Sequence, residues 1–256
     1  MAKKKRTYNY HKYINDWMYA VEQKEVHSSK EIKQLMPILR ETLDDPNVFF
    51  DAEQVEKYVE QTEKYYFDLM PDQKCYASLI LGLYYKDTEM LVFPTTFILA
   101  GRGWGKNGFV STLADFMQTE FHGIKDYDID IVATAEDQAM TSFNEVYAKV
   151  GGLGKEMSKA LYDYNKTQIT YRKTNSKLRF RTSNAKTKDG GRPGCVIFDE
   201  IHAYEDYQNI KVFTGGLGKI ERPRRIYITT DGEIRDGVLD DYKERARRIL
   251  EGETEH

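Results

Sequence analysis

A glycine-rich turn that directly follows an apolar run constrains the fold of this chain more than any other feature. Residues 91–99 are almost all apolar or β-branched, which predicts a buried strand, and helical spacing of apolar residues resumes at Phe109. The turn between them consists of Gly101, Arg102, Gly103, Trp104, Gly105 and Lys106. Small residues let successive backbone N–H groups curl around an anion, and the helix N-terminus adds positive potential. We therefore predict a phosphate-binding loop whose Lys106 reaches the terminal phosphates.

The loop departs from the usual phosphate-loop pattern at both of its ends. The first glycine of that pattern would fall on Ala100, and Asn107 stands where a Ser or Thr hydroxyl normally ligates Mg²⁺. Strings of this kind also occur by chance, and glycine turns between strands and helices are common for packing reasons. Trp104 could lie over a nucleotide or support the turn from behind, and we expect packing.

A second predicted strand ends in two adjacent carboxylates. Residues 195–198 form an apolar run, and Asp199 and Glu200 follow it directly. Open α/β sheets bind ligands at the C-terminal ends of their strands, although acidic pairs there are often only solvated turn residues. We expect the loop and the acidic pair to lie on neighbouring strands and to face one triphosphate. In that site Asp199 would hold Mg²⁺, and Glu200 would deprotonate the attacking water.

Two weaker signals lie at other strand and helix ends. Thr229 and Thr230 close the next β-type run, and their hydroxyls could sense the γ-phosphate and transmit hydrolysis to a moving segment; an ordinary strand-ending turn is an equal alternative. Gln73 follows Pro71 upstream of the loop, and its amide could pair with both edges of adenine. A surface glutamine at a helix start is the commoner case.

Strands and helices alternate along most of the chain. Apolar periodicity predicts helices near residues 14–21, 55–69, 75–83, 109–117, 139–150 and 238–250, strands at 91–99, 129–134, 195–198 and 226–229, and a hairpin turning at 174–176. This order predicts an α/β fold with a mainly parallel central sheet covered by helices. We expect residues 1–70 to form a helical N-terminal extension packed on a core of residues 71–256, which ends in a C-terminal helix.

Composition excludes several classes of protein. With 38 basic and 41 acidic residues, the net charge of -3 does not fit a protein whose whole surface grips nucleic acid, so any DNA contact must be local. Candidate basic clusters lie at residues 3–6, 186–192, 222–225 and 243–248. No apolar run approaches the roughly 18 residues of a membrane span, and the N-terminus does not resemble a secretory signal. Two cysteines, Cys75 and Cys195, are expected to be reduced and buried in a cytoplasmic protein.

Together these residues resemble the ATPase domain of the large terminase subunit of tailed bacteriophages, the motor that packages DNA into procapsids. The resemblance covers most of the chain and includes a Leu-x-Pro-x-Gln stretch at residues 69–73, the loop with Arg102 four residues before Lys106, the acidic pair and the two threonines. It implies a P-loop NTPase of the ASCE/RecA-like type that uses ATP and Mg²⁺. Residue by residue, it implies that the nucleotide is bound by Gly101, Arg102, Gly103, Trp104, Gly105, Lys106 and Asn107, with Gln73 near adenine. Arg102 and Lys106 would contact the phosphates, and Asp199 would bind Mg²⁺. Glu200 would be the catalytic base, and Thr229 and Thr230 would form the coupling motif.

The resemblance also implies partners. It implies a homo-oligomeric ring on a portal in the host cytoplasm, double-stranded DNA as the translocated polymer, the small terminase subunit as a partner, and no membrane. A neighbour's arginine could stabilise charge on the γ-phosphate, and the candidates are Arg172, Arg179, Arg192, Arg222, Arg224 and Arg225. Family members continue into an RNase H-like nuclease domain. Because this chain stops at His256, we expect an isolated motor domain that does not itself cleave DNA.

Two alternative functions remain at this stage. The run from Asp199 to His202 also matches the DExH motif of helicase-type ATPases, but the residues after Thr230 are too few for the second RecA-like domain that such enzymes need. A nucleotide-binding interaction module without turnover is the other alternative, in which Asn107 marks a lost metal site.

Overall fold

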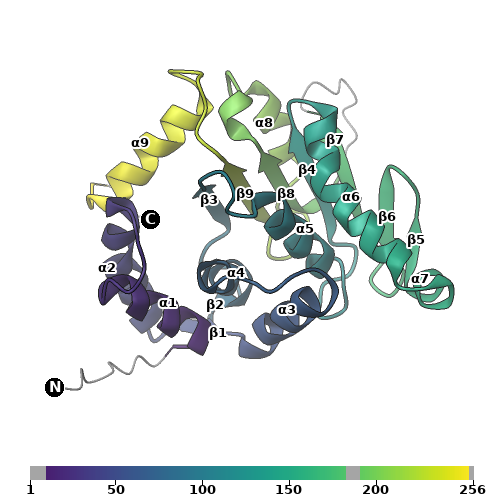
Figure 1. The fold of residues 1–256 in the computed structure, drawn as a ribbon, viewed down its shortest axis with the longest axis horizontal. Coiled ribbons are helices and arrows are strands. Elements are labelled where there is room, and N and C mark those ends of the chain that lie inside the picture. Colours follow the sequence, from purple (N-terminus) through teal and green to yellow (C-terminus); the bar gives the residue numbers. More distant parts are fainter. Residues whose placement is uncertain (1–9, 183–190, 254–256) are drawn as a thin grey trace. The chain divides into compact units, whose positions relative to one another are not determined.

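A computed structural model describes residues 10–182 and 191–253, which form two compact units. One unit comprises residues 1–59, 68–93 and 243–256, and the other comprises residues 60–67 and 94–242. The basic cluster at 3–6 and residues 186–190 of the second cluster lie outside the described residues. Figure 1 labels the elements along the chain. Both units are discontinuous in sequence, so the expected division at residue 70 and the packing of residues 1–70 on the sheet stay predictions.

The first unit is a helical assembly with a small hairpin of strands. It contains α1 (Lys12–Glu22), α2 (Lys30–Asp44), the first part of α3 (Ala52–Tyr65), α4 (Pro71–Gly82), and the antiparallel strands β1 (Val48–Phe50) and β2 (Leu83–Tyr85). Helix α1 buries one face because its apolar residues recur at helical spacing. The core that α1, α2 and α4 share consists of Ile14, Trp17, Met18, Val21, Met36, Leu39 and Cys75.

The second unit is built on a seven-stranded sheet. Its strands are β3 (Thr95–Leu99), β4 (Asp128–Ala133), β5 (Tyr162–Tyr164), β6 (Gln168–Tyr171), β7 (Ser176–Thr182), β8 (Pro193–Asp199) and β9 (Arg224–Thr229), and they lie side by side in the order β3-β9-β8-β4-β7-β6-β5. The first five strands of this order are parallel, and the last two pair antiparallel. The predicted α/β fold with a mainly parallel sheet is confirmed.

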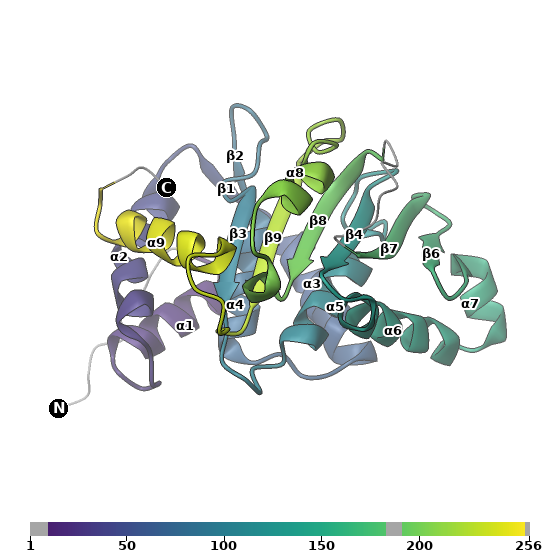
Figure 2. The same ribbon diagram turned by 90° about the horizontal axis from the view of Figure 1, so that it is seen from above.

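Helices cover the sheet. They are α5 (Lys106–Met117), α6 (Glu136–Gly152), α7 (Lys155–Leu161), the short η1 (Ile201–Ala203), α8 (Gln208–Thr214) and the start of α9 (Val238–Leu250). Helices α5 and α6 run side by side (Figures 1 and 2). Because side chains alternate along a strand, Val196 and Phe198 of β8 share one face, where they join Ile210 of α8 and Val238 and Leu239 of α9 in a buried cluster.

Four details of the local prediction are wrong. The strand expected at 91–99 begins at Thr95 and is not buried: β3 lies at one end of the described sheet, and Leu99 is 44% exposed. The helix expected to reach Leu69 ends at Tyr65. Strand β9 lies between β3 and β8, so the loop and the acidic pair do not follow neighbouring strands. Helix α2 was not predicted, and neither were the short elements β1, β2, β5, α7, η1 and α8.

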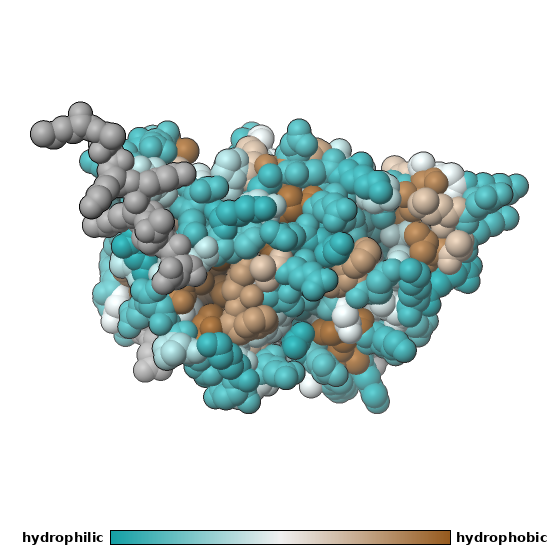
Figure 3. Space-filling view, turned by 90° about the horizontal axis from the view of Figure 1, so that it is seen from below, coloured by the Kyte–Doolittle hydropathy of each residue, from teal (hydrophilic) through white to brown (hydrophobic). Residues whose placement is uncertain are grey.

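The hydrophilic surface and the burial of both cysteines agree with what the composition predicts. One face of the molecule is mostly hydrophilic, with smaller apolar patches between the polar residues (Figure 3). Cys75 and Cys195 are both free and buried. None of the helices in residues 10–182 and 191–253 combines the length and apolarity that a membrane crossing requires.

Candidate functional site

The glycine-rich loop joins β3 to α5 in a conformation that requires glycine. Gly103 and Gly105 both have φ of +84°, in the left-handed region that a side chain disfavours. A Cβ at Gly103 would meet no atom within 4 Å, so the backbone angle rather than crowding excludes a side chain there. Gly105 is the N-cap of α5, and Lys106 is the first residue of that helix. The first N–H groups of α5 therefore point toward the loop, as an anion site requires.

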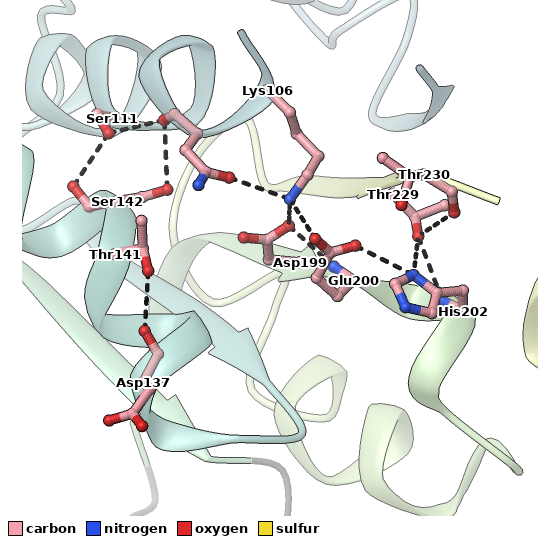
Figure 4. Close-up of polar contacts among 11 residues, drawn as sticks. Lys106, Ser111, Asp137, Thr141, Ser142, Asp199, Glu200, His202, Thr229 and Thr230 are labelled. Carbon is pink, nitrogen blue, oxygen red and sulfur yellow. Dashed lines mark hydrogen bonds and ion pairs between the residues drawn. The ribbon is translucent and has the colours of Figure 1, made fainter. Parts of the chain in front are cut away.

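Close packing holds the start of α5 in place. A Cβ at Gly108 would lie 2.6 Å from the Phe67 ring, so only glycine allows this approach. The Ser111 hydroxyl lies 2.7 Å from the carbonyl oxygen of Asn107 and 3.0 Å from that of Ser142, which ties α5 to α6 (Figure 4). The Trp104 ring packs edge-on against Phe109, with the centroids 5.2 Å apart. This contact agrees with the expected packing role of Trp104.

Lys106 brings the loop and the acidic pair together. Its Nζ lies 2.5 Å from Asp199 Oδ1 and 2.9 Å from Glu200 Oε1, and it donates to Asn107 Oδ1 at 3.1 Å (Figure 4). The Lys106 side chain is 10% exposed and that of Asp199 only 2%. Although β9 separates the two strands, the lysine side chain spans the gap and places two carboxylates beside the predicted phosphate loop.

The acidic pair occupies an unusual local environment. Burial raises the pKa of Asp199, and the nearby ammonium of Lys106 only partly offsets this effect. Glu200 has φ 54° and ψ 49°, a left-handed conformation that is rare for a residue with a long side chain. Its N–H donates to Ile228 O at 3.0 Å and to Asp199 Oδ1 at 2.9 Å, which holds the strained turn. Strain of this kind gathers at functional sites.

Thr229 joins the same cluster through a residue that the sequence prediction did not use. Thr229 ends β9, and its hydroxyl donates to the Thr230 carbonyl at 2.7 Å. His202 Nδ1 lies 2.8 Å from Thr229 Oγ1 and 3.0 Å from Glu200 Oε2 (Figure 4). The match of residues 199–202 to the DExH motif includes His202, but that motif indicates a helicase-type ATPase and not a contact between His202 and Thr229.

Arg102 and Thr230 lie beside this cluster on a shallow depression. The depression has a volume of about 290 Å³ and is lined by Leu99, Ala100, Gly101, Arg102, Thr230 and Asp231. Arg102 is exposed on its wall. An exposed guanidinium next to the loop is available to an anionic ligand, as the prediction for Arg102 requires.

Gln73 lies in the first unit and has a structural role there. Its Oε1 accepts a hydrogen bond from Met70 N–H at 3.0 Å and caps the start of α4. The side chain is buried rather than on the surface, with 2% exposure. A contact between Gln73 and adenine stays a prediction.

The contacts of three of the six candidate arginines are defined within the chain. Arg224 is buried, with Nη1 3.0 Å from both His122 Nε2 and Tyr127 Oη. Arg179 pairs with Asp128 and Asp130, and Arg172 donates to the carbonyls of Lys159 and Tyr162. A buried guanidinium cannot reach a neighbouring subunit, so Arg224 is excluded as a trans-acting finger. Arg192 and Arg225 are exposed.

The oxygen atoms beside Lys106 fit a magnesium ion whose remaining ligands come from the phosphates of a nucleotide. Mg²⁺ prefers oxygen ligands and is usually bound through one or two carboxylates plus substrate phosphates. Asp199, Glu200 and the Asn107 amide supply such oxygens. Within the described part of the chain, no group of three or more His, Cys, Asp or Glu residues could hold a metal ion by itself. The triphosphate would therefore have to complete the coordination shell.

Comparisons with known proteins identify the family. The sequence model for "Terminase large subunit, ATPase domain" matches residues 75–248, more than half of the chain. The terminase large subunits of Lactococcus phages p2 and SK1 are each 28% identical over 193 residues, which is 70% of this chain but only 34% of each relative. The chain thus spans about a third of their length.

A solved structure supports the fold. The HK97 bacteriophage large terminase superimposes with a TM-score of 0.63 at 18% identity, over 76% of this chain and 41% of that one. The P-loop NTPase fold expected from the resemblance agrees with this neighbour. On the strength of the family match, the chain belongs to the ATPase domain family of terminase large subunits.

Proposed function

We propose that this domain is the ATP-hydrolysing motor of a viral DNA-packaging terminase, and that it couples hydrolysis to the translocation of double-stranded DNA into a procapsid. The observation that carries the proposal is the position of Lys106 between Asp199 and Glu200 at the mouth of a glycine-rich loop. A cation on a phosphate loop beside two carboxylates is the set of groups that phosphoryl transfer needs.

Nucleotide binding would replace carboxylate partners of Lys106 by phosphate oxygens. The loop from Gly101 to Asn107 and the N-terminus of α5 supply N–H groups for phosphate oxygens, and Arg102 adds a second cation. When Lys106 turns to the β- and γ-phosphates, it releases at least one carboxylate, and Glu200 is the less buried of the two. ATP binding would thus free the group that hydrolysis requires. The adenine contact of Gln73 belongs to this proposal as well.

Hydrolysis would use the freed carboxylate of Glu200 as a general base. A carboxylate beside the γ-phosphate can orient a water molecule and accept its proton as the water oxygen attacks the γ-phosphorus. The bond from that phosphorus to the β,γ-bridging oxygen breaks, so that ADP and phosphate are the products. Mg²⁺ bound by Asp199, and directly or through water by Asn107, would neutralise charge on the phosphates. Thr229 and Thr230 would transmit the change to the segment that follows β9.

The proposal also includes contacts with DNA and with other proteins. Arg222 and Arg225, from the cluster at 222–225, and the cluster at 243–248 would hold DNA phosphates, whereas the buried Arg224 would not. Such contacts make binding sequence-tolerant and steeply dependent on salt. Arg192, Arg222 and Arg225 remain as candidates for a trans-acting arginine in a homo-oligomeric ring. The portal and the small terminase subunit would be partners in the host cytoplasm.

Steady-state ATP hydrolysis with and without double-stranded DNA tests the proposal. We expect turnover by the wild type and a loss of at least about a hundredfold in Glu200→Ala, with nucleotide binding retained. Glu205→Ala is the matched control, because Glu205 is an exposed glutamate on the same segment. No turnover by the wild type under any condition, with binding kept, would instead indicate a nucleotide-binding module without catalysis.

A further inference from the structure

His202 lies between the candidate catalytic base and the end of β9. Its Nδ1 is 3.0 Å from Glu200 Oε2 and 2.8 Å from Thr229 Oγ1, and its backbone N–H donates to the same Thr229 oxygen at 3.3 Å (Figure 4). His202 belongs to the η1 turn, which directly follows the strained Glu200. One imidazole nitrogen therefore contacts groups from two different strand ends.

The hydrogen-bond network determines where the His202 proton lies. The Thr229 hydroxyl has a single proton, and it donates that proton to the Thr230 carbonyl at 2.7 Å, so Thr229 Oγ1 acts as an acceptor toward His202. An ionised Glu200 carboxylate can only accept. Both neighbours of Nδ1 are thus acceptors, and this assigns a proton to Nδ1. That proton is hydrogen-bonded to Thr229 Oγ1, while Glu200 Oε2 lies 3.0 Å from the same nitrogen as a close contact without hydrogen-bond geometry.

The opposite side of the His202 ring is closed by backbone. A Cβ added to Gly232 would lie 2.6 Å from His202 Cβ and 2.8 Å from Cγ and Cδ2, so the segment after Thr230 packs directly on the imidazole. The Gly232 N–H donates to the Asp231 carboxylate at 3.0 Å. The ring therefore has little room to turn while residues 229–232 keep this conformation.

The two oxygens of the Glu200 carboxylate have different neighbours. Lys106 Nζ contacts Oε1 at 2.9 Å, and His202 Nδ1 contacts Oε2 at 3.0 Å. If phosphate draws the lysine away, the His202 contact is the one that still fixes the carboxylate, and Oε1 becomes available for a water molecule. A shift of the segment 229–232 would move the His202 ring and thereby change the position of the Glu200 carboxylate.

We infer that His202 is a positioning residue that aims the Glu200 carboxylate and couples its orientation to the segment Thr229–Gly232. The inference rests on the proposed hydrolytic function and adds to it a specific link between the base and the strand end. His202 touches neither phosphate nor water in this scheme, since it acts through Glu200 and Thr229.

Substitutions of His202 separate a positional role from a packing role. Asn can place its amide N–H near the position of Nδ1, whereas Ala removes the donor and Gln places its amide farther along the side chain. We expect His202→Ala to lower kcat about tenfold to a hundredfold with little change in KM for ATP, and His202→Asn to restore most of the loss. His27→Ala is the control, because His27 is exposed in the first unit. An unchanged kcat in His202→Ala, or equal losses in the Ala and Asn variants with intact folding, would overturn the inference.

If His202→Ala unfolds, His202→Gln and Thr229→Val provide the test. Val is nearly isosteric with Thr and removes only the oxygen that His202 contacts. Because the two residues act through one contact, we expect the kcat losses of His202→Gln and Thr229→Val to be non-additive in the double variant. Additive losses would mean that the two residues act independently, and the link would be wrong.

A spectroscopic measurement keeps the inference separate from the proposed function. Side-chain ¹⁵N NMR of the wild type reports which imidazole nitrogen carries the proton, whether or not ATP is hydrolysed. We expect His202 to carry a proton on Nδ1 and the Nδ1 signal to shift in Glu200→Gln and in Thr229→Val. A neutral tautomer protonated only at Nε2 would overturn the inference, while absent turnover with a protonated Nδ1 would count against the proposed function alone.

Discussion

Two lysines in the sheet-containing unit are buried against aspartates, and their surroundings differ in a way that separates chemistry from structure. Lys106 Nζ lies 2.5 Å from Asp199, and Lys149 Nζ lies 2.9 Å from Asp115. All four side chains are at most 10% exposed. By residue type, distance and burial, the two pairs are nearly the same.

The Lys149 pair is balanced in charge and surrounded by neutral donors. Asp115 Oδ2 accepts from Gln61 at 2.9 Å, and Oδ1 accepts from Gln118 at 3.3 Å and Tyr162 at 3.4 Å. Lys149 also donates to the Tyr162 hydroxyl at 2.8 Å. Such a network surrounds the Asp115 carboxylate with donors from the chain and fastens α3, α5, α6 and β5 to one another.

The Lys106 cluster has one positive charge against two negative ones. Glu200 contributes the surplus carboxylate from a left-handed backbone conformation, and the adjoining loop contains two further left-handed residues, Gly103 and Gly105. An excess of negative charge beside an open loop attracts a cation, and strain is retained where it serves a function. The comparison teaches that charge balance and backbone strain, rather than a buried ion pair as such, mark the candidate site.

Removal of each lysine should give opposite phenotypes, and this is the largest effect that we expect. Lys149→Ala leaves the Asp115 carboxylate buried without its cation, which should cost about 3–5 kcal/mol of unfolding free energy. Lys106→Ala removes the lysine that would bind the phosphates and should lower ATP turnover at least about a hundredfold. We expect a smaller loss of stability than in Lys149→Ala, because the pKa of Asp199 is already raised by burial and the protonated carboxyl can stay buried without a cation. Denaturant unfolding and steady-state hydrolysis measure the two effects on each variant. If Lys106→Ala unfolds as readily as Lys149→Ala, the distinction between the clusters fails.

Local features of this site were predictable from sequence, whereas the sheet order and the second lysine cluster were not. The loop at 101–106 and the pair at 199–200 combine glycine or carboxylate side chains with strand ends, and both signals span a few residues. The insertion of β9 between β3 and β8 depends on contacts far apart in sequence, which local periodicity does not report. For the same reason nothing adjacent to Asp115 indicated Gln61 or Lys149 as its partners.

Isosteric replacement of the two aspartates sharpens the comparison. Asp115→Asn keeps an acceptor for Tyr162 but turns an amide toward the donors Gln61 and Lys149, so we expect a loss of about 1–3 kcal/mol of unfolding free energy. Asp199→Asn should unfold at the same temperature as the wild type or slightly higher. Burial raises the pKa of Asp199, which means that its charged form costs stability at neutral pH despite Lys106.

The sign of the pH dependence follows from that raised pKa. Between the ordinary pKa of Asp199 and its raised folded value, the folded state binds more protons than the unfolded state. The contribution of Asp199 to stability therefore falls as pH rises through this window, and Asp199→Asn should remove that part of the profile. Thermal unfolding across the acidic range measures it. A clear loss of stability in Asp199→Asn at neutral pH would show that the Lys106 pair stabilises the fold as the Lys149 pair does.

A third buried cluster, around Arg224, should respond to pH in the opposite direction. His122 Nε2 lies 3.0 Å from Arg224 Nη1, and because a guanidinium only donates, the imidazole must accept and stay neutral. Burial, aided by Arg224, lowers the pKa of His122 well below its ordinary value. Below about pH 6.5 the unfolded chain binds a proton that the folded His122 does not bind, so the contribution of His122 to stability is lost as pH falls below this value. His122→Gln, whose amide oxygen can accept from Arg224, should flatten this part of the profile. An unchanged profile in His122→Gln would mean that the imidazole is protonated in the folded protein, and the cluster would then lack the neutral acceptor that allows Arg224 to be buried.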